Sequence, residues 1–269
     1  MLVSLVAIGV VACAAPRRLD ASKPAATATS DKRPWSLNPP IGLALPDEAV
    51  VHVVSKGVGC SGTLITGSLV LTAHHCVVER TASGEILEKD LDPGAIEVEI
   101  GGDYLPWATV RVRAVVTPPC GYRGGHGDIA LLVLSRRLVG IATMAVRLDR
   151  PAAVGEIIEP VGFGHCPMST DGVHRIRREG GPVGRIGIGA VTAMASICPG
   201  DSGGPARSIS TGEVVGIVSA GAMDETEKTR DPSMYTRIDK WRALFENAQA
   251  MVDGASRCEV PPVPGCEPQ

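Results

Sequence analysis

From about residue 45 onward, the chain consists of short apolar or alternating runs, each bounded by glycine, proline, aspartate or serine. The runs are rich in β-branched residues, and their spacing is typical of strands in an all-β sandwich or barrel. With 32 glycines and 21 prolines among 269 residues, long uninterrupted helices are disfavoured and a helical bundle is nearly excluded. We expect strands at residues 49–54, 61–66, 69–73, 96–100, 110–116, 129–134, 156–163, 214–219 and 234–238.

One segment has helical periodicity. It follows Asp239, which suits the N-cap position, and Gly254 can end it. We therefore expect one amphipathic helix over residues 239–252, followed by a Cys/Pro-rich tail over residues 253–269. The apolar residues of the helix are Trp241, Leu244, Phe245, Ala248, Met251 and Val252.

A glycine-rich run at residues 184–189 contains the pattern GxxGxG. It follows no clear strand and precedes no convincing helix, so it is a weak candidate for a nucleotide-binding loop. We interpret it as a loop that connects two strands.

Hydropathy and charge narrow the class of protein further. Hydrophobic residues make up 44% of the chain and the mean hydropathy is +0.16, which is enough to bury a sizeable core and excludes global disorder. The formal net charge of −3 and the isoelectric point near 6.1 give no sequence-wide basic field for a phosphate backbone. We therefore expect no nucleic-acid partner.

The first residues, MLVSLVAIGVVA, are apolar or small and uncharged, but a helix that spans a bilayer needs about 20 such residues. We interpret residues 1–13 as an export signal. Residues 10–13 resemble a bacterial lipobox, which would leave Cys13 carrying lipid as a membrane anchor. Ordinary cleavage after Ala14, with plain secretion, fits the same residues. Residues 14–44 are rich in Ala, Pro, Ser and Thr and predict a flexible tether.

Three later segments carry chemically useful residues: 71–76 (LTAHHC), 127–132 (GDIALL) and 198–205 (CPGDSGGP). Together they resemble the signatures TAAHC, DIALL and GDSGGP of the trypsin/chymotrypsin-like serine proteases. The resemblance covers roughly residues 45–250, with further similar segments at 60–65, 162–164, 216–221 and 234–237.

This resemblance implies an all-β fold of two packed six-stranded Greek-key β-barrels (chymotrypsin-like) with a C-terminal α-helix and the active site between the barrels. The protease domain would span residues 45–252, with the N-terminal barrel over about 45–140, the C-terminal barrel over about 141–238 and the helix over 239–252. The implied function is a monomeric serine endopeptidase that acts on proteins or peptides through an acyl-enzyme, without a cofactor.

The residues explain why this chemistry is expected. A serine hydroxyl is a weak nucleophile near neutral pH and needs an adjacent base, and histidine can both accept and return the proton. We assign Ser202 as nucleophile, His75 as general base and then acid, and Asp128 as the buried carboxylate that orients the imidazole. The resemblance also implies that the backbone N–H groups of Gly200 and Ser202 form the oxyanion hole.

His74 stands where the family usually has a second alanine. We assign the base to His75 because it adjoins Cys76, and we expect His74 to be packed or solvated because adjacent side chains on a strand point to opposite faces. His74, His75 and Cys76 are contiguous and cannot all converge on one zinc ion, so we expect no metal site.

The resemblance also bounds the substrate preference. The floor of the primary specificity pocket corresponds to Ser196, where trypsin-like enzymes carry aspartate, and Gly221 leaves the pocket entrance open. Ser219 and Gly221 would pair with the substrate backbone as a short β-ladder. We expect an uncharged, medium to large apolar residue at the cleaved position (P1).

One feature departs from the family. There, cleavage exposes an IVGG-like amino terminus whose ammonium pairs with the aspartate before the nucleophile, here Asp201. This chain has no IVGG, and its nearest candidate, Ile41, follows a proline. Three interpretations stay open: unusual processing at Ile41, another partner for Asp201, or weak activity. The last leads to the alternative function, a catalytically weak or inactive protease-like binding domain; a secreted esterase with the same triad is a further alternative.

The eight cysteines favour an oxidising compartment. The resemblance implies a Cys60–Cys76 bridge beside the catalytic histidine, and a Cys166–Cys198 bridge is plausible near the pocket. With Cys13 lipidated, an odd number remains, and sequence alone does not pair Cys120, Cys258 and Cys266.

Overall fold

The computed structural model describes residues 46–102, 105–119, 127–166, 172–221 and 232–263. The predicted export signal with Cys13, and the predicted tether, lie outside the described residues. So do Cys120 and Cys266.

The first barrel is closed by six antiparallel strands in the order β1-β2-β3-β8-β7-β6. Its core forms because alternating strands place one face inward, as in Ile96–Ile100, where the isoleucines and Val98 are buried and the glutamates point outward. β8 is buried along its whole length. The strands are β1 (Val50–Ser55), β2 (Val58–Thr66), β3 (Leu69–Thr72), β6 (Ile96–Ile100), β7 (Ala108–Val116) and β8 (Ala130–Leu134).

The second barrel has the order β9-β11-β12-β15-β14-β13 and closes where β13 pairs with β9, while the short β10 pairs with the end of β9 at Val161 and Gly162. Ile158, Val183, Val191 and Tyr235 fill its core. The strands are β9 (Ile157–Gly162), β10 (Ile176–Arg177), β11 (Gly181–Ile186), β12 (Ala190–Ala193), β13 (Pro205–Ser208), β14 (Val214–Ala220) and β15 (Ser233–Arg237). The predicted fold class, two six-stranded barrels with a C-terminal helix, is confirmed.

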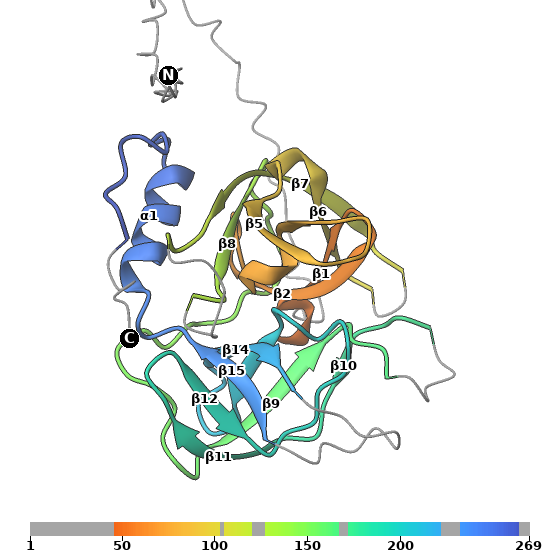
Figure 1. Cartoon of the computed structure of the whole chain (residues 1–269), viewed down its shortest axis with the longest axis vertical. Coiled ribbons are helices and arrows are strands. Elements are labelled where there is room, and N and C mark those ends of the chain that lie inside the picture. The colour runs from red at the N-terminus through yellow and green to blue at the C-terminus, as the bar shows by residue number, and fades with distance from the viewer. Residues whose placement is uncertain (1–45, 103–104, 120–126, 167–171, 222–231, 264–269) are drawn as a thin grey trace, which may run out of the picture. The chain divides into compact units, whose positions relative to one another are not determined.

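Short elements complete the described chain. Helix α1 (Arg242–Val252) packs on β8 of the first barrel (Figure 1). The others are the 3-10 helices η1 (Pro46–Ala49), η2 (His74–Cys76) and η3 (Pro93–Ala95), and the two-stranded pair of β4 (Val78–Arg80) and β5 (Ile86–Asp90).

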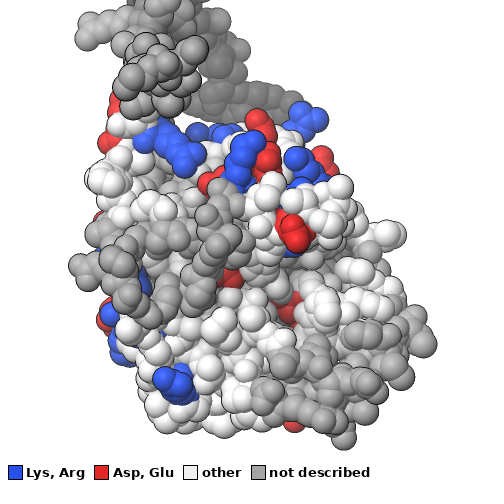
Figure 2. Space-filling view, in the orientation of Figure 1, with Lys and Arg blue, Asp and Glu red and all other residues white. Residues whose placement is uncertain are grey.

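Figure 2 shows that charged side chains on this face gather mainly over the first barrel. Among the helices of the described residues, none is long and apolar enough to cross a membrane.

Two local expectations were wrong. The helix begins at Arg242, because the Asp239 carboxylate is held by Arg237 (2.6 Å between Oδ2 and Nη2) and does not cap it. The glycine-rich run is not a loop throughout: β11 extends to Ile186, and only then does the chain turn. At the start of this strand, ahead of the run, a Cβ on Gly181 would lie 2.0 Å from the Met194 carbonyl oxygen, so only glycine fits there.

Candidate active site

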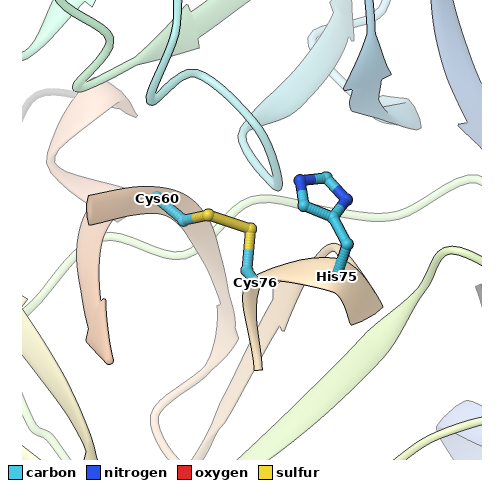
Figure 3. A group of neighbouring side chains, drawn as sticks. All are labelled: Cys60, His75 and Cys76. Atoms are coloured by element: carbon cyan, nitrogen blue, oxygen red, sulfur yellow. A yellow bond between two sulfur atoms is a disulfide. The ribbon is translucent and has the colours of Figure 1, made fainter. Parts of the chain in front are cut away.

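His75 lies on η2, directly after β3, at the face of the first barrel that meets the second. The disulfide between Cys60 of β2 and Cys76 of η2 ties this turn to the neighbouring strand, as Figure 3 shows. β3 ends at Thr72, whose hydroxyl donates to the Ser61 carbonyl (2.7 Å) and so holds the end of β3 against β2. The turn that carries His75 follows directly.

Asp128 contacts His75 directly. Its Oδ2 lies 2.9 Å from the ring Nδ1, and its Oδ1 accepts the backbone N–H of His75 at 3.0 Å. Asp128 is 3% exposed, and burial alone would raise the pKa of its carboxyl; the hydrogen bonds and charge of His75, with a hydrogen bond from Ser219, lower this pKa below the ordinary value. An ionised acceptor on Nδ1 keeps the proton there and leaves Nε2 free to accept one.

Ser219 contributes to this site in a way the sequence did not indicate. Its hydroxyl donates to Asp128 Oδ2 at 2.5 Å. The register of β14 against β15 shifts between Val218 and Ala220, and such a bulge re-aims the side chain between them. The sequence predicts only a backbone role for Ser219, because a bulge leaves no mark in strand periodicity.

Ser202 lies on the loop between Cys198 and β13, held by both barrels. Its carbonyl accepts the Ser61 N–H (2.8 Å), and the N–H of Gly203 donates to the Val218 carbonyl (2.8 Å). Gly203 has φ +83°, and a Cβ there would lie 2.3 Å from the Ser61 carbonyl oxygen, so only glycine fits. The described hydrogen bonds of the His75 ring are those to Asp128; contact between base and nucleophile commonly tightens only when substrate binds.

The expected oxyanion donors, the backbone N–H groups of Gly200 and Ser202, have no hydrogen-bond acceptor among the described residues. Gly200 has φ +98°, and its carbonyl is turned away to accept the Ser61 hydroxyl at 2.8 Å. The Pro199 carbonyl accepts the His165 N–H at 2.8 Å. Within the described chain, neither the Gly200 nor the Ser202 N–H donates an intramolecular hydrogen bond, so both can bind a developing oxyanion.

Asp201 is completely buried, and its partner is the side chain of Arg178. Arg178 Nε lies 2.8 Å from Oδ2 and Nη2 lies 3.2 Å from Oδ1. The backbone N–H groups of Cys198 (2.7 Å) and Gly164 (2.8 Å) donate to the same carboxylate. This contact corresponds to one of the three interpretations left open by the sequence, another partner for Asp201.

The expected specificity residues lie beside this loop. The Ser196 N–H donates to the Glu179 carbonyl at 3.1 Å. Ile197, which the sequence argument did not consider, is 5% exposed, and its Cδ1 lies 2.5 Å from where a Cβ on Gly221 would sit. The Ser233 hydroxyl, also close to Gly221, donates to the Ala195 carbonyl at 2.9 Å.

His74 is buried, which is one of the two environments expected for it. The expectation that His74 and His75 point to opposite faces of a strand was wrong, because both lie on the 3-10 helix η2. Its Nε2 lies 2.6 Å from Asp90 Oδ1, while the Thr117 hydroxyl donates to Asp90 Oδ2 at 3.0 Å. Burial raises the pKa of Asp90, but the hydrogen bond and charge of His74 outweigh it and lower this pKa. The two histidines therefore bind different aspartates.

The cysteines next to His75 do not form a metal site. The sulfur atoms of Cys60 and Cys76 and a ring nitrogen of His75 lie within 4.8 Å of one another. The two sulfurs are bonded to each other, so neither is available as a thiolate ligand (Figure 3). Cys166 and Cys198 form the second disulfide, and Cys258 is disulfide-bonded as well.

Two closed barrels with a buried aspartate on a histidine, beside a serine loop with free amides, define a chymotrypsin-like hydrolase. The family model described as Trypsin matches residues 44–244. The chain therefore belongs to the trypsin family of serine proteases and is a serine-type endopeptidase.

Individual relatives and solved structures are consistent with this family assignment. Trypsin iota of Drosophila melanogaster is 29% identical over 181 residues, covering 60% of this chain and 68% of the relative. A snake venom serine protease of Crotalus durissus durissus is 27% identical over 237 residues, covering 80% and 85%. Among solved structures, a Glu endopeptidase has a TM-score of 0.61 at 19% identity (78% of this chain, 93% of the other), and mouse neuropsin, a serine protease, has 0.60 at 21% (78% and 97%). At these identities the structures show the shared fold alone.

Proposed function

We propose that the protein hydrolyses peptide bonds through Ser202, His75 and Asp128. The observation that carries the proposal is the buried Asp128 carboxylate on Nδ1 of His75, which leaves Nε2 free as a base beside the serine loop. The Ser202 hydroxyl attacks the substrate carbonyl while His75 Nε2 takes its proton, and Asp128 stabilises the imidazolium that forms. The N–H groups of Gly200 and Ser202 bind the oxyanion.

The same groups complete the reaction. His75 returns the proton to the leaving amine, and the peptide carbonyl remains on Ser202 Oγ as an ester. Water then enters in place of the amine and attacks the ester carbonyl carbon while His75 takes its proton. The bond from that carbon to Ser202 Oγ breaks, His75 returns the proton to Oγ, and the product leaves as a carboxylic acid. No cofactor enters these steps.

We propose further that the P1 residue is uncharged and apolar. Ser196 puts no charge at the position that corresponds to the pocket floor. Gly221 leaves the entrance open, while Ile197 and Ser233, which contact Gly221, limit the space beneath it. Ile197→Ala should therefore extend the preference toward larger side chains.

A peptide library tests the activity and the P1 preference together. The wild-type protein should cleave after uncharged apolar residues, and Ser202→Ala should lose about 10⁶ in kcat. Ser210→Ala is the matched control, because Ser210 is an exposed serine eight positions further along the chain. Dominant cleavage after Arg or Lys would overturn the P1 preference, and unchanged cleavage by Ser202→Ala would overturn the mechanism.

We also propose that the mature protein is exported, is anchored to a bacterial membrane by lipid on Cys13, and is a monomer. The two described disulfides support an oxidising compartment, and the lipobox-like residues 10–13 support the lipid. Mass spectrometry of the mature amino terminus decides the anchor: a lipid-modified Cys13 supports it, and an unmodified terminus after Ala14 indicates plain secretion. Size-exclusion chromatography with light scattering checks the monomer.

A further inference from the structure

The carboxylate of Asp201 determines how the serine loop is held. Asp201 lies between Gly200 and Ser202, whose N–H groups are proposed to bind the oxyanion, and it has no solvent exposure. A buried carboxylate without a counter-charge is strongly disfavoured. The loop therefore keeps this arrangement only if a cation is supplied from within the protein.

Arg178 supplies that cation and fills the available space. Arg178 Nε and Nη2 donate to the two carboxylate oxygens of Asp201, and Nη2 also donates to the Gly164 carbonyl at 2.5 Å. The carboxylate is packed against glycines: a Cβ on Gly162 would lie 2.4 Å from Oδ1, and one on Gly164 would lie 2.5 Å from Cγ. With the Cys198 and Gly164 amides, Asp201 has a full set of donors and a closely packed environment.

The first residues that the structure describes are bound by arginines other than Arg178. Arg178 follows β10, and its N–H donates to the Pro160 carbonyl at 2.8 Å. Two other arginines of this segment bind η1: Arg177 Nη2 lies 2.5 Å from Asp47 Oδ2, and Arg175 donates to the Asp47 carbonyl at 2.8 Å. The segment around β10 thus fixes the chain near Asp47 and supplies the counter-ion of Asp201 as a side chain.

We infer that Arg178 is a positioning residue that takes the place of an amino-terminal ammonium, so that the oxyanion hole of this protease forms without activating cleavage near Ile41. The inference rests on the proposed function of Ser202. It also has a consequence for pH: an α-amino group loses its proton near pH 8, whereas a guanidinium stays protonated wherever proteins fold. The oxyanion hole should therefore persist well above pH 9.

The first test is a set of variants. Arg178→Ala should lower kcat/KM by about 10²-fold or more, through kcat, because it leaves the Asp201 carboxylate buried and unpaired. Arg178→Lys should keep part of the activity near neutral pH and lose it near pH ~10, where a lysine ammonium deprotonates. Arg177→Ala is the matched control: it removes a neighbouring arginine and its ion pair with Asp47, and its kcat should equal that of the wild type. Wild-type kcat for Arg178→Ala in a folded protein would overturn the inference.

The second test does not depend on a variant that folds. The full chain is prepared with its amino terminus intact, as checked by mass, and the rate of reaction of Ser202 with a peptide phosphonate is measured at pH 7 and pH 9.5, with and without acetylation of the α-amino group. We expect acetylation to leave the rate unchanged at each of the two pH values. Labelling that requires a newly cleaved terminus, or that acetylation abolishes, would overturn this inference alone. Failure of every form to label would overturn the proposed function and this inference with it.

Discussion

Removing the Ser219 hydroxyl tests whether this residue acts through its side chain. In Ser219→Ala, Asp128 loses a donor 2.5 Å from Oδ2 but keeps Nδ1 and the backbone N–H of His75. A hydrogen bond to a buried charge contributes about 1.5–3 kcal/mol, and the remaining donors place the loss near the lower end. We expect kcat to fall about 10-fold, because the carboxylate stabilises the imidazolium less well in the transition state.

Steady-state kinetics on a peptide substrate separates the two roles. Alanine keeps the backbone groups that would pair with substrate, so KM should stay near the wild-type value while kcat falls. The control is Ser208→Ala, which removes the hydroxyl of a fully buried serine that also donates to a carboxylate, Glu156 Oε1, in the second barrel. This control should lose stability and keep kcat. An unchanged kcat in Ser219→Ala, or a loss confined to KM, would refute the side-chain role.

Three further changes have defined outcomes. Asp90→Asn should cost about 1–3 kcal/mol of stability at neutral pH. Because the pKa of Asp90 is lowered in the folded protein, its contribution is present above about pH 4 and is lost as pH falls through the folded value, so the Tm values of variant and wild type should converge in acid; a constant difference down to pH 2 would argue against an ionised Asp90. Replacing Cys60 and Cys76 together by alanine opens a loop with a sequence separation of 16 and should cost about 3 kcal/mol in denaturant unfolding, and an unchanged midpoint would contradict it. Gly203→Ala should abolish peptide hydrolysis, since its Cβ cannot fit beside Ser61; wild-type activity would show that the loop can shift.

The sequence predicted the parts of this protein that depend on local motifs. The segments around His75, Asp128 and Ser202 are contiguous and carry their own chemistry, so the three residues could be assigned before their contact was known. Most strands with β-branched alternation, such as β6 and β8, were also predicted within one or two residues. β11 and β13, which begin with glycine and proline respectively, were missed because their identity depends on close packing against neighbours.

Contacts between segments that carry no recognisable motif could not be predicted. Arg178 reaches Asp201 across 23 positions from beside a two-residue strand, which has no detectable periodicity. Ser61 could have been noticed only as a polar residue next to Cys60; in the structure its hydroxyl bridges the Gly200 carbonyl and the Phe163 N–H. The absence of IVGG was the one signal that pointed to an unusual partner for Asp201, and it named no residue.

The most direct test of the central claim is the site and stoichiometry of labelling by an organophosphonate, read by intact mass and peptide mapping of the folded protein. We predict one label per chain, located on Ser202, with the reaction lost in His75→Ala because the base is missing. Absence of labelling in the folded wild-type protein, or a label on any other residue, would contradict the proposal that Ser202 and His75 form the catalytic centre.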